Sequence, residues 1–331
     1  MTVLTALRLS MTNVADPAAD HGERYRAALD MAAYADRCGF TGISCEEHHL
    51  ASNGWLPSPL ILAAAIAGRT STVPISVNAL IVTLYDPLRL AEDIAVLDNI
   101  SAGRFSFVAG MGYRPEEYHA VGRDWTRRAQ LMDECLETLL NAWKDEPFEY
   151  RGKLVNVTPK PHTKPRPFFF VGGMSPAAAK RAARFGLPFS PPMAMPELEA
   201  LYTEELTKNG HRGFVFSPAK GSTVTLLSRD PDAAWATHGD LLMNEATEYS
   251  AWKQDGLRRP NDVTPTSAEH LRSLGNVEIL TPEELIKQCE AGRRAVTMNP
   301  LIGGLPLDDA WASLRLLGDE VVPQLASPDA P

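Results

Sequence analysis

The chain has 331 residues, of which 44% are hydrophobic and 22% are charged, as in an ordinary globular protein. Its 32 basic and 41 acidic residues give a net charge of −9, which argues against nucleic acid and anionic membranes as partners, because both select basic surfaces. The four cysteines show no paired spacing, and no apolar stretch is long enough to cross a bilayer. We therefore expect reduced thiols and a cytoplasmic location.

Strand and helix patterns alternate along the chain. Continuous apolar segments predict strands at 3–9, 41–47, 75–84, 104–110, 166–173, 187–193, 222–228 and 295–302. Helical spacing and N-cap residues predict helices at 23–38, 58–68, from 86, 126–143, 175–186, from 281 and 307–318. Eight such strands, alternating with helices, predict a (β/α)8 TIM barrel, an α/β fold in one domain over 1–331, with an open doubly wound sheet as the alternative.

Residues 229–280, after the seventh predicted strand, do not follow this alternation and show no clear strand. We expect an irregular insert there. A long excursion after a barrel strand is often a lid or binding loop, and the other interpretation is a peripheral helical insert.

The second predicted strand ends in Glu47, His48 and His49. Reactive groups of such barrels lie at the carboxyl ends of the strands. Adjacent strand residues point to opposite faces, so one metal ion bound by both histidines is disfavoured, and we predict no metal site. One imidazole there could instead transfer protons near neutral pH, or could be a structural histidine bonded to a backbone carbonyl.

A glycine turn follows the fifth predicted strand. Gly172 and Gly173 allow close backbone approach, and Ser175 and Pro176 open a helix whose N-terminus favours an anion such as phosphate. The alternative is a tight strand–helix turn that requires glycine for its backbone angles.

Another glycine motif ends the fourth predicted strand. Gly110, Met111 and Gly112 do not form a dinucleotide fingerprint, because Pro115 stands where the third glycine belongs. We expect Gly110 to clear space for a flat group.

Five stretches, GFTGISCEEHH, DPLRLAEDIAVLDNISAGRFSF, GMGYRPEEY, VGGMSPAAAKRAARFGLP and LTPEELI, together resemble the bacterial luciferase-like flavin-dependent monooxygenases, in the alkanal-monooxygenase-like branch. The resemblance covers roughly 1–190 and 280–325. It implies a barrel that binds reduced FMN from a separate flavin reductase. Oxygen would add to the flavin to give a hydroperoxide, which then oxidises a substrate.

The resemblance also implies roles for individual residues. The catalytic histidine of the family falls on His48. It would act as an acid or base toward the flavin–oxygen adduct. The phosphate-binding serine falls on Ser175. An acidic residue and an arginine of the family are replaced by Met174 and Met111, so the backbone N–H groups from Gly173 to Ser175 would carry more of the phosphate binding.

Two further positions follow from the resemblance. A non-prolyl cis peptide beside the flavin ring falls on Asn78–Ala79. A reactive cysteine is replaced by Gly110, which argues against a thiol role there.

The predicted helix at 58–70 is apolar almost all round, which requires cover on both sides. The resemblance implies that this helix contributes to a homodimer. Cover by a loop of the same subunit is the alternative.

Apolar and aromatic residues are expected at the mouth of the barrel: Trp55, Leu56 and Tyr113, with Trp235 and Trp252 of the insert. They suit a hydrophobic small organic molecule as substrate, used together with O2.

Three alternative functions are considered. A deazaflavin-dependent oxidoreductase would transfer hydride on the same barrel. A non-catalytic flavin-binding partner subunit would lack the histidine, whereas His48 is present. A metal-dependent hydrolase would need a ligand set that the sequence does not show.

Overall fold

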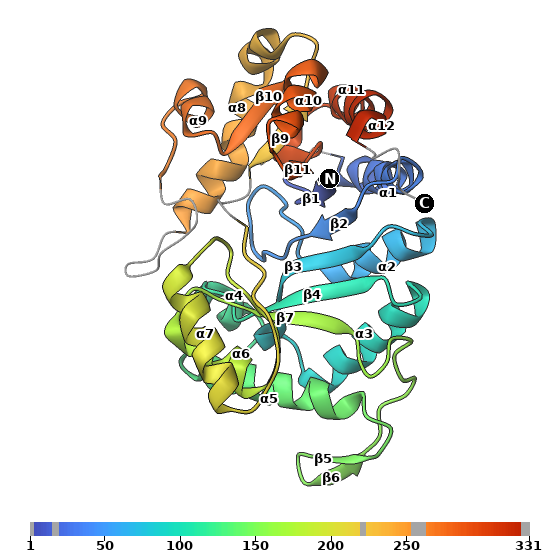
Figure 1. Cartoon of the computed structure of the whole chain (residues 1–331), viewed down its shortest axis with the longest axis vertical. Helices are drawn as coiled ribbons and strands as arrows, with labels where there is room; N and C mark the ends of the chain where they lie inside the picture. The colour runs from blue at the N-terminus through green and yellow to red at the C-terminus, as the bar shows by residue number, and fades with distance from the viewer. Residues whose placement is uncertain (1–2, 15–19, 219–222, 253–262, 326–331) are drawn as a thin grey trace. The chain divides into compact units, whose positions relative to one another are not determined.

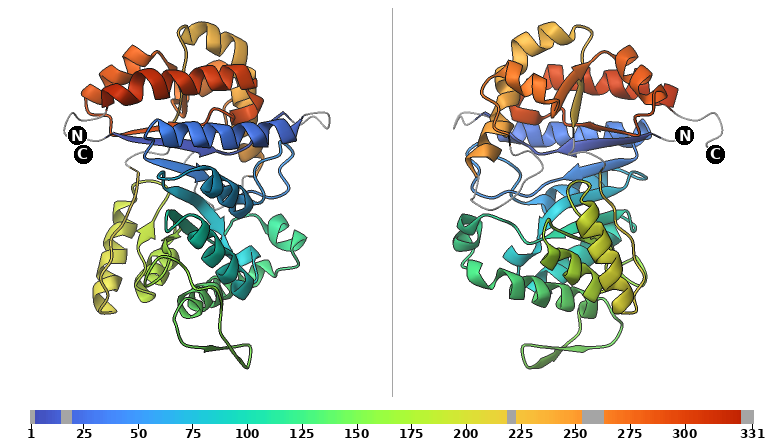
Figure 2. Two further views of the ribbon diagram at one scale, coloured as in Figure 1. Left: turned by 90° about the vertical axis from the view of Figure 1, so that its right-hand side faces the viewer. Right: turned by 60° about the vertical axis from the view of Figure 1, so that its left-hand side comes forward.

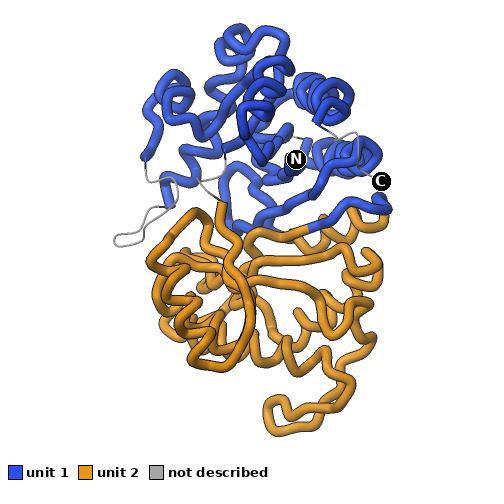
Figure 3. Tube along the Cα trace, in the orientation of Figure 1, with its two compact units in different colours: residues 1–57, 69–75, 221–331 blue, residues 58–68, 76–220 orange. Residues whose placement is uncertain are grey.

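The computed structural model describes residues 3–14, 20–218, 223–252 and 263–325. The chain divides into two compact units (Figure 3). Unit 1 comprises residues 1–57, 69–75 and 221–331, and unit 2 comprises residues 58–68 and 76–220. Both are built from parallel strands and helices, the α/β composition that the alternating pattern predicts.

Unit 1 contains a parallel sheet with the strand order β10-β9-β11-β1-β2. Its elements are β1 (Leu4–Leu9), α1 (His21–Arg37), β2 (Gly42–Cys45), β9 (Val224–Leu227), α8 (Pro231–Ala251), α9 (Ala268–Leu274), β10 (Val277–Leu280), α10 (Pro282–Glu290), β11 (Ala295–Met298), η3 (Ile302–Gly304), α11 (Leu307–Arg315), the π-helical η4 (Leu316–Val321) and α12 (Val322–Leu325). Leu7 at the centre of this sheet is paired with Met298 on one side and Ile43 on the other, and it is fully buried.

Unit 2 contains a sheet with the order β3-β4-β7-β8. Its elements are α2 (Pro59–Arg69), β3 (Ile75–Ile81), η1 (Val82–Leu84), α3 (Pro87–Ile100), β4 (Phe105–Gly110), α4 (Pro115–Ala120), η2 (Trp125–Arg127), α5 (Arg128–Ala142), β5 (Phe148–Tyr150), β6 (Lys153–Val155), β7 (Phe168–Gly172), α6 (Pro176–Arg184), β8 (Phe189–Ser190) and α7 (Pro196–Lys208), with the end residues Arg69 and Ile75 grouped in unit 1. Helices α6 and α7 pack side by side (Figure 1).

Predicted helix starts agree with the structure because local capping determines them. Asp86 caps α3 by accepting from the N–H groups of Leu88 and Arg89. At α10 the capping box is complete: Thr281 Oγ1 accepts from Glu284 N at 3.1 Å, and Glu284 Oε2 accepts from Thr281 N at 2.8 Å.

The described parts of residues 229–280 are mostly helical, as the alternative of a helical insert expects, but they also contain a strand, so the expectation of an irregular segment without a strand is wrong. They form α8, α9 and the strand β10, which pairs in parallel with β9. The sequence does not predict β10 because this strand has only four residues, of which just two, Val277 and Ile279, are buried.

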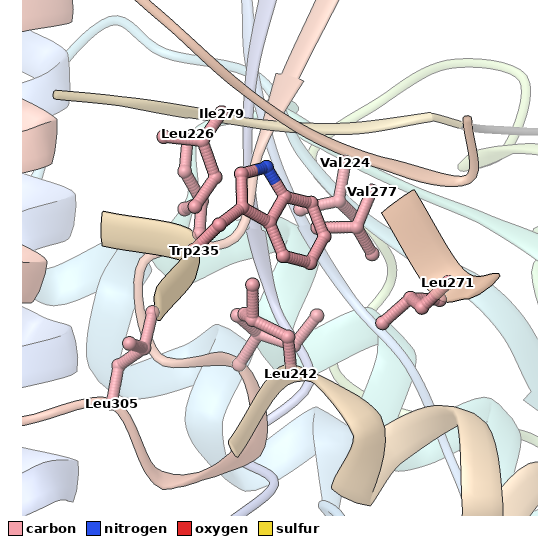
Figure 4. Close-up of a cluster of buried hydrophobic side chains, with 9 residues drawn as sticks. Val224, Leu226, Trp235, Leu242, Leu271, Val277, Ile279 and Leu305 are labelled. Carbon is pink, nitrogen blue, oxygen red and sulfur yellow. The ribbon is translucent and has the colours of Figure 1, made fainter. Parts of the chain in front are cut away.

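Trp235 of α8 lies in the core of unit 1 and does not line a mouth, which corrects the expectation for this residue. Figure 4 shows its indole among side chains of β9, β10, α9 and the segment after η3. Its neighbours in this cluster include Val224, Leu226, Leu242, Leu271, Val277, Ile279 and Leu305. Burial of so large a ring supplies a few kcal/mol, about 1.5–3 for a typical large side chain, and ties α8 to the sheet.

Two strand predictions differ from the structure for local reasons. β8 has only two residues instead of the predicted seven, because Pro188, Pro191 and Pro192 have no N–H to donate to a neighbouring strand. The hairpin β5–β6 was not predicted. Its turn residues Arg151 and Gly152 both have positive φ, 49° and 75°, as a tight two-residue hairpin turn requires.

The last helical segment of unit 1 lies beside α1 (Figure 2). The ring of Tyr34 on α1 meets Trp311 of α11 edge-on at 5.8 Å, and the Tyr34 hydroxyl donates to Asp319 at 2.7 Å. We find, in the part of the chain that the structure describes, no helix with the length and apolar character that crossing a membrane requires.

One carboxylate of α1 fixes the segment that leads into β3. Asp36 accepts hydrogen bonds from the backbone N–H groups of Ser71, Thr72 and Val73 at 2.6–3.0 Å and from the Thr72 hydroxyl at 2.7 Å. Burial alone would raise the pKa of Asp36, but these hydrogen bonds lower it to about 2.

We predict that Asp36→Ala destabilises the protein by about 2–3 kcal/mol at neutral pH, because donors to a charged acceptor lose their partner. The folded-state pKa lies below the unfolded value of about 3.9, so this stability is present above pH 4 and is lost as pH falls toward 2. Urea unfolding of both proteins from pH 7 to pH 2 measures it. Glu23→Ala, an exposed acid on the same helix, should have little effect. A pH-independent difference would contradict this account.

Candidate functional site

The two adjacent histidines lie beyond the end of β2. The strand stops at Cys45, so strand alternation does not govern His48 and His49, contrary to the argument from sequence. They nevertheless have different partners. His49 Nε2 lies 3.0 Å from Oε1 of Glu47, which is 2% exposed, while His48 packs among aromatic rings.

We call these rings the His48 cluster: His48, Trp55, Tyr249 and Trp252. The imidazole centroid lies 4.6 Å from the ring of Trp55, 4.9 Å from Trp252 and 6.1 Å from Tyr249. Trp55 and Trp252 are themselves 5.4 Å apart. Two segments thus meet at the imidazole: the loop after β2, and α8 with the residue that ends it.

Trp55 and Leu56 are buried, whereas the sequence leads us to expect them at an open mouth of the barrel. They are 4% and 1% exposed. Trp55 meets the imidazole edge-on and closes one side of it. Trp252 keeps the predicted association with the candidate site, because its ring lies against His48.

A buried charge group lies next to this cluster. We call it the Arg8 network: Arg8, Glu46 and Glu245. Arg8 Nε and Nη2 lie 2.7 and 2.8 Å from the two oxygens of Glu46, and Nη2 also lies 2.8 Å from Oε1 of Glu245. One guanidinium therefore holds a carboxylate from the His48 loop and another from α8.

The Arg8 network shifts the pKa values of Glu46 and Arg8. Burial raises the pKa of Glu46, the charge of Arg8 opposes this, and the nearby charge of Glu245 raises it further. Burial lowers the pKa of Arg8, but the two carboxylates outweigh burial and raise it, so the guanidinium stays charged.

Arg8 and Glu245 were not among the predicted site residues. A signal for Arg8 was present, since a charged residue inside the apolar strand segment VLTALRL needs a buried partner. Glu245 had no such signal, because its helix was not predicted and its partner lies 237 positions away.

In unit 2 the predicted phosphate turn joins β7 to α6. Ser175 is the N-cap of α6, with its side chain accepting from Ala178 N at 3.3 Å, and Pro176 opens the helix. Gly173 has φ 149°, and a Cβ there would lie 2.5 Å from the Cβ of Ala178. A Cβ on Gly172 would lie 2.6 Å from Val108. Packing thus requires both glycines, and Gly173 alone also has the positive φ that the alternative interpretation requires.

The peptide bond Asn78–Ala79 is cis, which confirms the expectation for this bond. Asn78 is exposed and donates from Nδ2 to the Ser76 hydroxyl at 3.0 Å. Gly110 lies beside this bond, because a Cβ on Gly110 would be 2.9 Å from the Cβ of Ala79. Gly110 therefore admits the neighbouring strand.

The segment after β4 is fixed by hydrogen bonds to one carbonyl. Met111 O accepts from the hydroxyls of Tyr118 at 2.6 Å and Thr83 at 2.8 Å. Arg114 and Glu117 form a buried ion pair at 3.2 Å. Tyr113, which precedes Arg114 in the sequence, is half-buried. These contacts hold the backbone of the predicted cofactor segment in one conformation.

Within the described residues, no three His, Cys, Asp or Glu side chains come together as a metal site would require.

Comparison with known proteins identifies the family. The family model described as luciferase-like monooxygenase matches residues 5–297. The alkanal monooxygenase beta chain of Vibrio harveyi is 28% identical over 166 residues, 48% of this chain and 51% of that one. The alpha chain of Photorhabdus laumondii is 26% identical over 172 residues, 50% of this chain and 48% of that one. The chain spans about half the length of these curated relatives.

Three solved structures share the fold over nearly their whole length. Monooxygenase RslO1 from Streptomyces bottropensis has a TM-score of 0.74 at 22% identity, covering 98% of this chain and all of that one. The oxygenating constituent of 3,6-diketocamphane monooxygenase from Pseudomonas putida, in complex with FMN, has a TM-score of 0.67 at 19% identity. The match covers 99% of this chain and 100% of that one. An F420-dependent secondary alcohol dehydrogenase has a TM-score of 0.66 at 18% identity, covering 99% of this chain and 100% of that one.

The predicted fold class, the α/β barrel of luciferase type, is confirmed by this shared fold. The family model covers most of the sequence, from the second residue of β1 to the third residue of β11. The chain belongs to the luciferase-like monooxygenase family.

Proposed function

We propose that the protein is a flavin-dependent monooxygenase that uses reduced FMN, delivered by a separate flavin reductase, to oxidise a hydrophobic small organic molecule with O2. One oxygen atom enters the substrate, the other leaves as water, and the flavin supplies the two electrons. The family membership supports the reaction class. Four unpaired thiols agree with the proposed cytoplasmic location.

The observation that carries the proposal is the position of His48 in a family member. Its imidazole lies at the end of a buried parallel strand and is enclosed by Trp55, Tyr249 and Trp252. Aromatic neighbours exclude water from the imidazole, and an imidazole can transfer protons near neutral pH. We assign His48 the role of acid or base during oxygen transfer, and Trp55 and Tyr113 contacts with the substrate.

For the cofactor we assign Asn78, Ala79, Gly110, Met111 and the turn 172–175, that is Gly172, Gly173, Met174 and Ser175. The turn fits a phosphate group. Ser175 is exposed at the start of α6, and the first turn of α6 has no acidic residue. By contrast, α7 and α10 each begin with two glutamates, which would repel an anion.

Two alternatives share this fold or family. A deazaflavin cofactor is used by one protein of the same fold, the F420-dependent dehydrogenase. The relatives include both the alpha and the beta chain of alkanal monooxygenase, and a non-catalytic partner subunit is the second alternative. The presence of His48 favours the catalytic role over that of a partner subunit. Binding titrations with FMN and with a deazaflavin decide between the two cofactors.

We also propose a homodimer formed through α2 and α3. Ile61 of α2 is 74% exposed, and Val96 and Ile100 of α3 are 44% and 48% exposed. The exposure of these large apolar side chains agrees with a surface that another protein covers.

His48→Ala should retain reduced FMN and lose product formation by about 10²- to 10⁴-fold, the usual contribution of a proton-transfer group. Oxygen uptake should then yield peroxide in place of oxygenated product, measured with a reductase and a panel of hydrophobic aldehydes, ketones and aromatic compounds. His49→Ala is the matched control, since His49 pairs with Glu47. Full activity in His48→Ala, or loss only in His49→Ala, would disprove the assignment.

Ser175→Ala should weaken FMN binding about tenfold and leave riboflavin binding unchanged, because riboflavin lacks the phosphate. Fluorescence quenching titrations with FMN, riboflavin and a deazaflavin measure this directly. Ser267→Ala removes an equivalent N-cap from α9 and should change none of them. Equal losses for FMN and riboflavin would show that Ser175 is only a helix cap.

Ile61→Glu should convert a dimer to a monomer in sedimentation and light-scattering measurements, because the charge would be buried unpaired at the interface. Leu154→Glu is the matched control, since Leu154 in β6 is 75% exposed, almost as Ile61 is. A wild-type monomer, or a dimer that survives Ile61→Glu, would refute this interface.

A further inference from the structure

One face of α8 connects the Arg8 network to the His48 cluster. Glu245 and Tyr249 in α8, and Trp252 directly after it, are spaced by four and three positions, so they lie on the same side of the helix. Glu245 is 8% exposed. All of the contacts described below are within unit 1.

The first end of this face is held by a set of donors that converge on one carboxylate. Glu245 Oε1 accepts from Arg8 Nη2 at 2.8 Å. Its Oε2 accepts from the hydroxyls of Ser10 at 2.8 Å and Thr12 at 3.0 Å, with Asn299 Nδ2 at 3.5 Å. Arg8 lies in β1, Ser10 and Thr12 follow its end, and Asn299 follows the end of β11, so the carboxylate ties α8 to two strands.

The other end of the face contacts the imidazole. Trp252 and Tyr249 lie 4.9 and 6.1 Å from the His48 ring, and each also contacts Trp55, at 5.4 and 6.1 Å.

Arg8 links both sides of the imidazole. The same guanidinium that holds Glu245 on α8 also binds both oxygens of Glu46, two positions before His48. A shift of α8 along its axis would therefore break a buried ion pair as well as the ring contacts. Leaving one partner of such a pair buried alone is strongly unfavourable.

We propose that Glu245 is a positioning residue for the reaction: it fixes α8 so that Tyr249 and Trp252 hold the imidazole of His48 in its working orientation. The inference rests on the proposed role of His48. Displacement of a reactive group by about 1 Å costs about a hundredfold in rate, so loss of this anchor should lower turnover without contact between Glu245 and the substrate.

The coupled indoles provide a readout that needs no flavin. Trp55 and Trp252, 5.4 Å apart and inclined by 41°, should give an exciton couplet in circular dichroism of the cofactor-free protein. Trp252→Phe identifies this signal by abolishing it. Glu245→Gln and Glu245→Ala test the anchor, and Asp240→Asn, exposed on the same helix, removes the same charge as Glu245→Gln.

We expect the couplet to fall at least twofold in Glu245→Gln and to vanish in Glu245→Ala, with turnover about tenfold to a hundredfold lower. Asp240→Asn should match the wild type in both. Glu245→Gln keeps an acceptor for Ser10 and Thr12, so it tests the proposal even where Glu245→Ala fails to fold. An unchanged couplet in Glu245→Gln, or a lost couplet with wild-type turnover, would overturn the proposal.

Failure of the proposed function gives a different result. A wild type that shows the couplet but neither binds flavin nor consumes O2 would remove the reaction while leaving the anchoring of α8 by Glu245 measurable.

Discussion

The sharing of one guanidinium by two carboxylates is the constraint on which the candidate site in unit 1 depends. Arg8 is placed inside the sheet by β1, and it binds Glu46 from the loop after β2 and Glu245 from α8. Removing these charges from water is costly, so the arrangement persists only where geometry and further hydrogen bonds are good. The hydroxyls of Ser10 and Thr12 supply those bonds. The enclosure of His48 follows, because both elements that flank it are held by Arg8.

In unit 2 the corresponding constraint is steric. Three glycines of the predicted cofactor segments are required by neighbouring protein atoms: Gly110 by Ala79, Gly172 by Val108 and Gly173 by Ala178. The three glycines are half-buried, and glycine lets other groups approach the backbone closely. At the turn before α6, backbone N–H groups at a helix start are the donors that an anion needs. Structural need and ligand binding are therefore compatible explanations of the same glycines.

The sequence predicted most elements of regular structure, because their signals are local. Capping residues such as Asp86 and Thr281 determine where helices begin, and continuous apolar runs mark the buried parallel strands. Errors arose where the signal was short or nonlocal. β8 is shortened by three prolines, and β10 has only two buried side chains. α8 was assigned to an irregular insert, and of its 21 residues only Trp235, Gly239, Leu242 and Glu245 are buried.

The amino-acid sequence by itself determined the α/β class, the resemblance to its family, the candidate histidine and the glycine turn, since each depends on neighbouring residues or on a short motif. Only the tertiary structure decided which side chains surround His48, that Trp235 belongs to the core, and that Arg8 and Glu245 are partners. The physical reason is that charge pairing and ring packing depend on distances in space. Residues 237 positions apart carry no mark in sequence of their contact.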